Sequence, residues 1–189
     1  MEYFATFSGE EFDPNDPNAD KIHIEDIAHA LSLLCRANGQ IIRFYSVAQH
    51  CINCTVEAKA RGLSARVQLA CLLHDASEAY LSDITRPVKR HLPEYKKMEK
   101  RLQDTIYNKF LITALSGEEL ALVDRIDNDI LVSEFDVLMR RRVYDSKPEL
   151  HSTPSFDLRD FKDVENTFLA HYYGDGLKIW LSGTEDRLS

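Results

Sequence analysis

The sequence contains no long hydrophobic run, and no stretch approaches the ~18 consecutive apolar residues that a membrane-spanning helix requires. A secretory signal, with a basic segment before an apolar one, is missing from the N-terminus, which reads Met-Glu-Tyr-Phe-Ala-Thr-Phe-Ser-Gly. Cysteine is scarce, with 4 in 189 residues, too few for the dense disulfide framework of a small secreted domain. These absences predict a cytoplasmic protein without membrane contacts, whose cysteines are reduced.

Positive charge is also in short supply. The chain has 23 Lys and Arg residues against 31 Asp and Glu residues, which gives a formal net charge of −8. This balance disfavours a broad basic face for a nucleic-acid polymer, but a small anionic ligand can bind wherever a few basic side chains converge. The length of 189 residues suits a single domain with a substantial core.

Hydrophobic periodicity predicts an all-α domain, a helical bundle that a small β-hairpin precedes. Ser46 and Ser116 are expected helix N-caps, the second in a capping box with Glu119. The domain is expected to span 1–189, with a hairpin and loop over 1–23, a helical core over 24–142, and a loop and helix over 143–189. Helices are expected over residues 24–37, 46–61, 65–81, 93–110, 117–142 and 160–173. The third is apolar on most sides, which predicts that it lies at the centre of the bundle.

Three of these helices carry ionisable residues on their apolar stripes. His50 lies beside the stripe of the second helix, His74 and Asp75 interrupt the third, and Asp127 replaces a packing residue on the fifth. A buried polar group needs a partner, and helices joined by their stripes would bring these four side chains together. Two imidazoles and two carboxylates suit a divalent transition metal (Mn²⁺, Co²⁺, Fe²⁺, Zn²⁺ or Ni²⁺) better than Ca²⁺.

Simpler interpretations compete at each position. His74 and Glu78 can form a helical i,i+4 hydrogen-bonded pair without any metal. Cys51-Ile-Asn-Cys54 could belong to a zinc site, but a second cysteine pair is missing and both residues lie on an apolar stripe, where a free cysteine acts as a small hydrophobe. Asp124 and Asp129 compete with Asp127 for the fourth ligand position, and Asp124 is the more serious rival.

The order of His50, His74-Asp75 and Asp127 resembles the H…HD…D pattern of the HD-domain metal-dependent phosphohydrolases. The segment His74-Asp-Ala-Ser-Glu78, followed by Asp83 and Pro87-Val-Lys89, resembles the bacterial 5′-deoxynucleotidase branch of that superfamily. The segments Phe44–His50 and Phe7-Ser-Gly resemble the YfdR-like proteins of bacteria and phages, as does the spacing from Asp127 to Glu134. The resemblance extends from Phe4 to about Met139 and implies an HD-domain helical bundle.

The resemblance implies a role for each matching residue. His50, His74, Asp75 and Asp127 match the metal ligands, whereas Glu78 and Asp83 match the residues that handle the attacking water and the leaving group. Arg36 matches a phosphate-contacting arginine, and it is followed by Ala37 where some deoxynucleotidases have an aromatic residue near the sugar. Arg43 and Lys89 are further candidates for phosphate contacts. The resemblance also implies a homodimer or a higher homo-oligomer.

We therefore expect a metal-dependent phosphohydrolase that converts deoxynucleoside 5′-monophosphates to nucleoside and phosphate. A deoxynucleoside triphosphate triphosphohydrolase is the alternative within the same fold, and Arg86, Lys89 and Arg90 supply the additional positive charge that it would need. A catalytically silent HD module with a binding or regulatory role is the alternative of a different class. The retention of buried charges argues against it.

Overall fold

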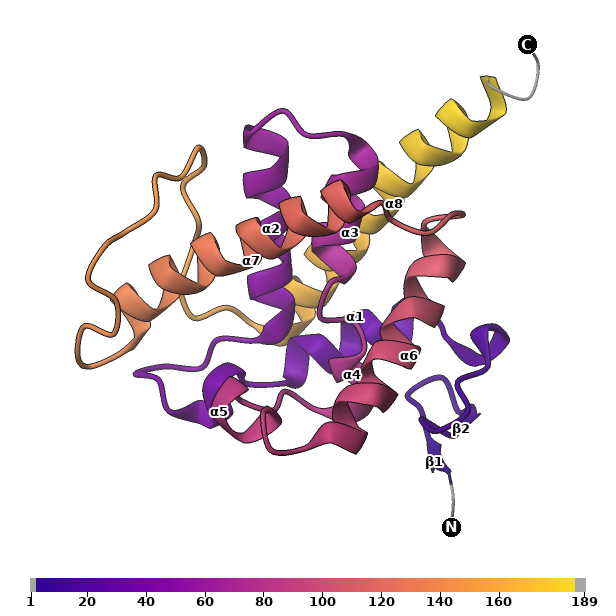
Figure 1. The fold of residues 1–189 in the computed structure, drawn as a ribbon, viewed down its shortest axis with the longest axis horizontal. Coiled ribbons are helices and arrows are strands. Elements are labelled where there is room, and N and C mark those ends of the chain that lie inside the picture. The colour runs from indigo at the N-terminus through magenta and orange to yellow at the C-terminus, as the bar shows by residue number, and fades with distance from the viewer. Residues whose placement is uncertain (1–2, 186–189) are drawn as a thin grey trace.

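The structure is a computed structural model that describes residues 3–185, with side chains described over 3–174, and it shows an all-α bundle with a small N-terminal hairpin (Figure 1). Residues 1–2 and 186–189 of the expected terminal segments lie outside the described residues. The strands are β1 (Phe4–Ala5) and β2 (Glu11–Phe12), which pair antiparallel with Phe4 opposite Phe12. The helices are α1 (Ile24–Leu33), α2 (Val47–Ala60), α3 (Ala65–Leu73), α4 (Glu78–Leu81), α5 (Arg86–Lys89), α6 (Pro93–Phe110), α7 (Gly117–Leu138) and α8 (Phe161–Glu185), with 3₁₀ turns η1 (Ala19–Lys21) and η2 (Arg36–Gly39).

Helices α2 and α7 begin where their capping residues predict. The Ser46 side chain accepts a hydrogen bond from the Gln49 backbone N–H, and the Gln49 side chain accepts one from the Ser46 N–H. Ser116 and Glu119 form the same reciprocal pair at the start of α7. Each box satisfies two backbone donors that the first helical turn leaves unpaired. Local sequence therefore sets where these two helices begin, and both helices carry residues of the candidate site.

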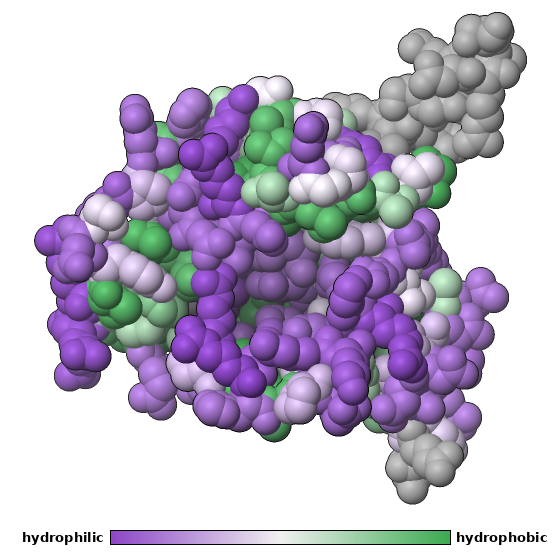
Figure 2. All heavy atoms as spheres, in the orientation of Figure 1, coloured by the Kyte–Doolittle hydropathy of each residue, from purple (hydrophilic) through white to green (hydrophobic). Residues whose placement is uncertain are grey.

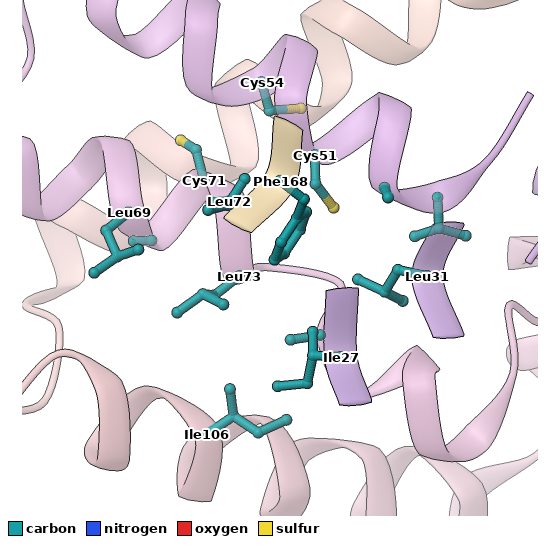
Figure 3. Close-up of a cluster of buried hydrophobic side chains, with 14 of the residues drawn as sticks. Ile27, Leu31, Cys51, Cys54, Leu69, Cys71, Leu72, Leu73, Ile106 and Phe168 are labelled. Carbon is teal, nitrogen blue, oxygen red and sulfur yellow. The ribbon is translucent and has the colours of Figure 1, made fainter. Parts of the chain in front are cut away.

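The bundle core surrounds α3, which packs against α2, α7 and α8. Every residue of α3 from Val67 to Leu73 is buried, as the apolar character of this segment predicts. Figure 3 shows Leu69, Leu72 and Leu73 among the buried side chains of this core. The α3 backbone therefore holds the residues that directly follow it in a fixed position at the centre of the molecule.

The predicted third helix over residues 65–81 is wrong, because α3 ends at Leu73 and α4 begins at Glu78. Between them the backbone tightens into turns in which N–H groups bond three residues back, from Ala76 to Leu73 and from Glu78 to Asp75. The His74 side chain also donates from Nδ1 to the Cys71 carbonyl oxygen, at 2.8 Å. Because of this break His74 and Glu78 do not lie on one continuous helix, as the alternative interpretation of an i,i+4 pair requires.

The first predicted helix is too long by four residues. Helix α1 ends at Leu33 because the chain then becomes extended and residues 34–36 pair with residues 45–47. The Arg36 N–H donates to the Tyr45 carbonyl, and the Val47 N–H donates to the Leu34 carbonyl. The fifth predicted helix also ends early, at Leu138 instead of residue 142. The last begins as expected but continues to Glu185. No helix in the described part of the chain is long and apolar enough to cross a bilayer.

Candidate metal centre

Three segments of the bundle bring four predicted residues to one point. Helix α2 supplies His50, the turn after α3 supplies His74 and Asp75, and α7 supplies Asp127. The His50 Nε2 atom lies 3.2 Å from His74 Nε2 and 3.0 Å from Asp127 Oδ1. The His74 Nε2 atom lies 3.3 Å from Asp75 Oδ2 and 3.7 Å from Asp127 Oδ1. Residues separated by up to 77 positions thus present their donor atoms to a common centre.

Hydrogen bonds behind the two imidazoles orient them toward this centre. His50 Nδ1 lies 2.6 Å from Glu134 Oε1, and His74 Nδ1 lies 2.8 Å from the Cys71 carbonyl oxygen. A neutral imidazole that donates Nδ1–H to such an acceptor has its lone pair at Nε2. When both rings are neutral, their Nε2 lone pairs face the centre, as in metal-ligating histidines, and a bound cation would take the place of the protons that the charged rings direct at Asp75 and Asp127.

The spacing of the donor atoms fits a small divalent cation. Two ligand atoms that each lie about 2.1 Å from one ion, at octahedral or tetrahedral angles, are separated by about 3.0 to 3.4 Å. The closest pairs among His50, His74, Asp75 and Asp127 lie at 3.0 to 3.3 Å. The Cys54 Sγ atom lies 3.5 Å from His50 Nε2, and His50, Cys54 and His74 form a group that could hold a metal ion. The structure therefore contains a group of side chains that can bind a metal, and the chemistry of the donors favours a transition metal.

Opposite charges stabilise one another strongly at this buried centre. Burial lowers the pKa of the His74 imidazole, but the attraction of Asp75 and Cys51 and the hydrogen bonds to Asp127 and Asp75 together outweigh it, so that this pKa lies well above its ordinary value. Burial raises the pKa of Asp127, but hydrogen bonds from His50 and His74 outweigh it and lower this pKa far below the ordinary range. The attraction and hydrogen bond of His74, with the charges of Arg36 and His50, together outweigh the burial of Asp75 and lower its pKa. Two ionised carboxylates therefore face the centre at neutral pH and supply the negative charge that a divalent cation requires.

Glu78 differs from these two carboxylates. Its side chain is buried, and its Oε2 atom has no hydrogen-bond partner among the described residues. Burial, together with the negative charges of Asp75 and Asp83, raises the pKa of Glu78 well above its ordinary value. Lys89 Nζ lies 3.6 Å from Glu78 Oε1 and opposes this effect only in part. A carboxyl group with a raised pKa beside a group of metal-binding side chains is a candidate for proton transfer.

The centre opens into a large cavity of about 970 Å³, lined by Arg36, His74, Asp75, Glu78, Asp83 and Lys89 among others. Figure 2 shows a hollow on this face of the molecule, between α7 and the segment that contains α5 and α6. Basic side chains of the segment that contains α5 and α6 line the cavity, and they include Arg86, Arg90, Lys96 and Lys100. A small anion could therefore reach the donor cluster from solvent.

The other predicted site residues lie at different distances from the donor cluster. Arg36 Nη1 lies 3.2 Å from Asp75 Oδ2, which places its guanidinium beside the centre. Asp83 lines the cavity and accepts a hydrogen bond from the Ala37 N–H at 3.2 Å. Arg43 is not among the lining residues, and its Nη1 atom lies 3.9 Å from Asp157 Oδ1. Of the predicted phosphate contacts, Arg36 and Lys89 are thus near the cluster and Arg43 is not.

The two alternative ligands on α7, Asp124 and Asp129, do not contact the histidines of the centre. Asp129 accepts a hydrogen bond from Arg61 at 2.8 Å, on a part of α7 that faces α2. Asp124 lines the cavity without any recorded contact to either histidine. Only Asp127, among these three α7 residues, has contacts below 4 Å to both His50 and His74.

Three residues of the site have other roles in the sequence analysis: Glu134 in a spacing, Cys54 in a cysteine pair and Arg86 as a charge for a triphosphate. Glu134 is buried and contacts His50, Tyr45 Oη at 2.9 Å and Arg36 Nε at 3.3 Å. Its position seven residues after Asp127 puts it on the same helical face, which was the available signal. Arg86 Nη2 lies 2.8 Å from Asp127 Oδ2, and no sequence signal connects the two. Cys54 is four residues after His50, a spacing that also predicts one face.

The fold and the donor cluster together define an all-α protein with a group of side chains that can bind a metal. Sequence comparison adds a family. The chain is 38% identical over 126 residues to the uncharacterized protein YfdR of Escherichia coli K12, covering 67% of this chain and 68% of YfdR. It is 40% identical over 114 residues to an uncharacterized protein of Rhodobacter capsulatus, covering 57% and 58% of the two chains. The chain belongs to the family of YfdR, and no model of a protein family matches it.

Proposed function

We propose that this protein is a metal-dependent phosphohydrolase that acts on nucleotides, with deoxynucleoside 5′-monophosphates as its preferred substrates and nucleoside and phosphate as the products. One observation carries the proposal: a compact His/Asp donor cluster lies in the wall of an open cavity, next to the buried Glu78, whose Oε2 atom has no hydrogen-bond partner among the described residues, and the largely buried Arg36. A structural metal site has no need of this opening, of the free Glu78 oxygen or of the surrounding cations. Phosphate hydrolysis needs all three.

In this proposal His50, His74, Asp75 and Asp127 hold the metal. When bound, the divalent ion supplies polarisation of a phosphoryl oxygen and a water of lowered pKa. Glu78 accepts a proton from the attacking water or delivers one to the leaving oxygen, and its raised pKa suits either transfer. Arg36, which already contacts Asp75 and Glu134, turns its remaining donors to the phosphate. Lys89, whose Nζ atom lies 3.6 Å from Glu78 Oε1, adds a second positive charge.

A triphosphate substrate is the second candidate. The cavity is larger than a monophosphate group needs, and Arg86, Arg90, Lys96 and Lys100 line it beyond Lys89. Acidic residues, among them Glu99 and Asp104, line the same wall and pair with Lys89 and Lys100. This pairing reduces the positive charge available to a polyphosphate, which is why we place the monophosphate first.

The test is product analysis with metal-stripped protein. The protein is supplied with Mn²⁺, Co²⁺, Fe²⁺, Ni²⁺ or Zn²⁺ and with ribo- and deoxynucleoside mono-, di- and triphosphates, and nucleoside, orthophosphate and tripolyphosphate are measured. We expect orthophosphate and nucleoside from deoxynucleoside monophosphates, whereas tripolyphosphate would identify the second candidate. Absence of turnover with every metal and nucleotide would refute the proposal and favour a binding module.

Variants separate the roles of the residues. His74→Ala and Asp75→Ala should lose both the metal and the activity, whereas Glu78→Gln should retain the metal and lose the rate, by about 10²- to 10⁴-fold for a missing proton-transfer group. Metal content by mass spectrometry is measured beside activity for each variant. An active Asp75→Ala protein would refute the assignment of the site.

A further inference from the structure

The cavity at the donor cluster has an apolar end that phosphate chemistry does not use. From Asp127 it continues along α7 and the segment after it, where hydrophobic side chains line it: Leu131, Phe135, Met139, Val143 and Tyr144. A second cavity, of about 470 Å³, adjoins this end and shares Gln40, Phe135, Met139 and Val143 with it. Figure 2 shows hydrophobic residues gathered at this end of the hollow, over the C-terminal end of α7.

From Asp127 onward, the lining residues on α7 recur at every fourth position. Asp127, Leu131, Phe135 and Met139 follow one another at i,i+4 intervals, with Met139 at the helix C-cap, so they lie along one face. At 1.5 Å per residue, Leu131 lies about 6 Å and Phe135 about 12 Å along the axis from Asp127. One helix face therefore carries a metal-binding carboxylate at one position and an aromatic ring two turns away.

An aromatic pair forms the apolar end. The Phe135 and Tyr144 ring centroids are 6.2 Å apart at an interplanar angle of 34°. Tyr144 is 37% exposed and Val143 47% exposed, whereas Phe135 is half-buried. A partly exposed aromatic surface inside a polar cavity suits a flat, weakly polar group that stacks on it.

We propose that this apolar end, with Phe135 at its centre, binds the nucleobase of the substrate by stacking. The proposal rests on the proposed nucleotide substrate. With the phosphate at the donor cluster, the sugar lies beside Leu131 and the base reaches the Phe135 ring. The three parts of the site then follow the order of phosphate, sugar and base in a nucleotide. Stacking uses the π-face that every base has, so the site discriminates nucleotides from phosphate esters without a base and selects only weakly among bases.

The experiment measures binding and turnover of a deoxynucleoside monophosphate, dAMP, and of the baseless 2-deoxyribose 5-phosphate, both with Mn²⁺ present. Phe135→Ala removes the ring, and Phe135→Tyr retains one. Val137→Ala is the control, because Val137 is a 43% exposed residue of α7 that does not line either cavity. Calorimetry supplies the dissociation constants, and phosphate release supplies kcat/KM.

We expect Phe135→Ala to weaken dAMP binding and to lower kcat/KM for dAMP by about 5- to 100-fold, the range of one stacked base. Binding of 2-deoxyribose 5-phosphate should stay unchanged, and Phe135→Tyr and Val137→Ala should behave as the wild type. Equal affinity of the wild type for the two ligands, or equal losses for both in Phe135→Ala, would overturn the proposal. Conversion of a dimer to a monomer by Phe135→Ala, with the affinity ratio unchanged, would assign the surface to a second copy of the chain and overturn it too.

The two proposals fail differently. Preferential, Phe135-dependent binding of dAMP without phosphate release would retain the nucleobase site and refute the hydrolase. Hydrolysis of both ligands with identical kcat/KM in the wild type would support the hydrolase and refute the nucleobase site.

Discussion

Glu134 joins the candidate metal centre to the buried interior, and its replacement by Gln tests that connection. The carboxylate is 1% exposed, and it contacts the His50 ring at 2.6 Å, the Tyr45 hydroxyl at 2.9 Å and the Arg36 guanidinium at 3.3 Å. The attraction of His50 and Arg36 outweighs burial and lowers the pKa of Glu134 below its ordinary value. Glu134→Gln keeps the size of the side chain and an oxygen acceptor but removes the charge.

Two effects of different size follow. Loss of a group that orients a metal-ligating histidine typically weakens metal binding by about 10- to 100-fold, or about 1.4 to 2.8 kcal/mol. Loss of the negative partner of a buried arginine costs about 3 to 5 kcal/mol of folding free energy in other proteins. Arg36 retains Asp75 as a partner, so we expect about 3 kcal/mol here. That is a large part of the ~5 to 15 kcal/mol by which domains are stable.

The assay pairs chelator competition for Co²⁺ with urea unfolding of the metal-free protein. Glu57→Gln is the matched control, because Glu57 is also a buried carboxylate. It lies on α2, and it accepts hydrogen bonds from His151, Ser152 and Arg61, which do not belong to the donor cluster. The control should lose stability and keep its metal affinity. Unchanged Co²⁺ affinity in a folded Glu134→Gln protein would refute the role of Glu134 in orienting a metal ligand.

Two further predictions concern stability away from the centre. Hydrogen bonds from the segment 151–152 and from Arg61 outweigh burial and lower the pKa of Glu57 to about 2, from an ordinary 4.5. Because this folded-state pKa is depressed, the stabilisation is complete above the unfolded pKa and is lost as the pH falls through about 2. It amounts to about 3 kcal/mol, and urea midpoints between pH 5 and pH 2 should fall less steeply in Glu57→Gln; parallel slopes would contradict this. Ser82 has φ 73° and ψ 153°, a conformation that costs a non-glycine residue about 1 to 3 kcal/mol, so Ser82→Gly should raise stability by about 1 kcal/mol after the added entropy of the unfolded chain. Differential scanning calorimetry measures this, and a lowered midpoint would show that Ser82 is not strained.

The sequence predicts most helices because their signals are local. A hydrophobic repeat of 3.6 residues and a serine cap lie within a few positions of one another, so the starts of α2 and α7 follow from Ser46 and Ser116 without any tertiary information. The end of α3 does not follow in this way. No glycine or proline follows Leu73 to mark the break, and apolar residues resume at Ala79, Tyr80 and Leu81, so the short-range turns at Ala76 and Glu78 leave no clear local signal. The early end of α1 has a non-local cause, its pairing with residues 45–47.

For the candidate site, the sequence by itself determined which residues are out of place: ionisable side chains on apolar stripes at His50, His74, Asp75 and Asp127 need partners. The sequence could not determine which residues are those partners. The contacts of Arg86 with Asp127 and of Glu134 with His50 and Arg36 depend on the rotation and register of helices that are far apart in the chain. Nor could it determine that the cavity continues to Phe135 and Tyr144. Those relations exist only after the apolar faces of the helices are buried together, since burial sets the register between helices and only then brings the distant polar atoms within reach.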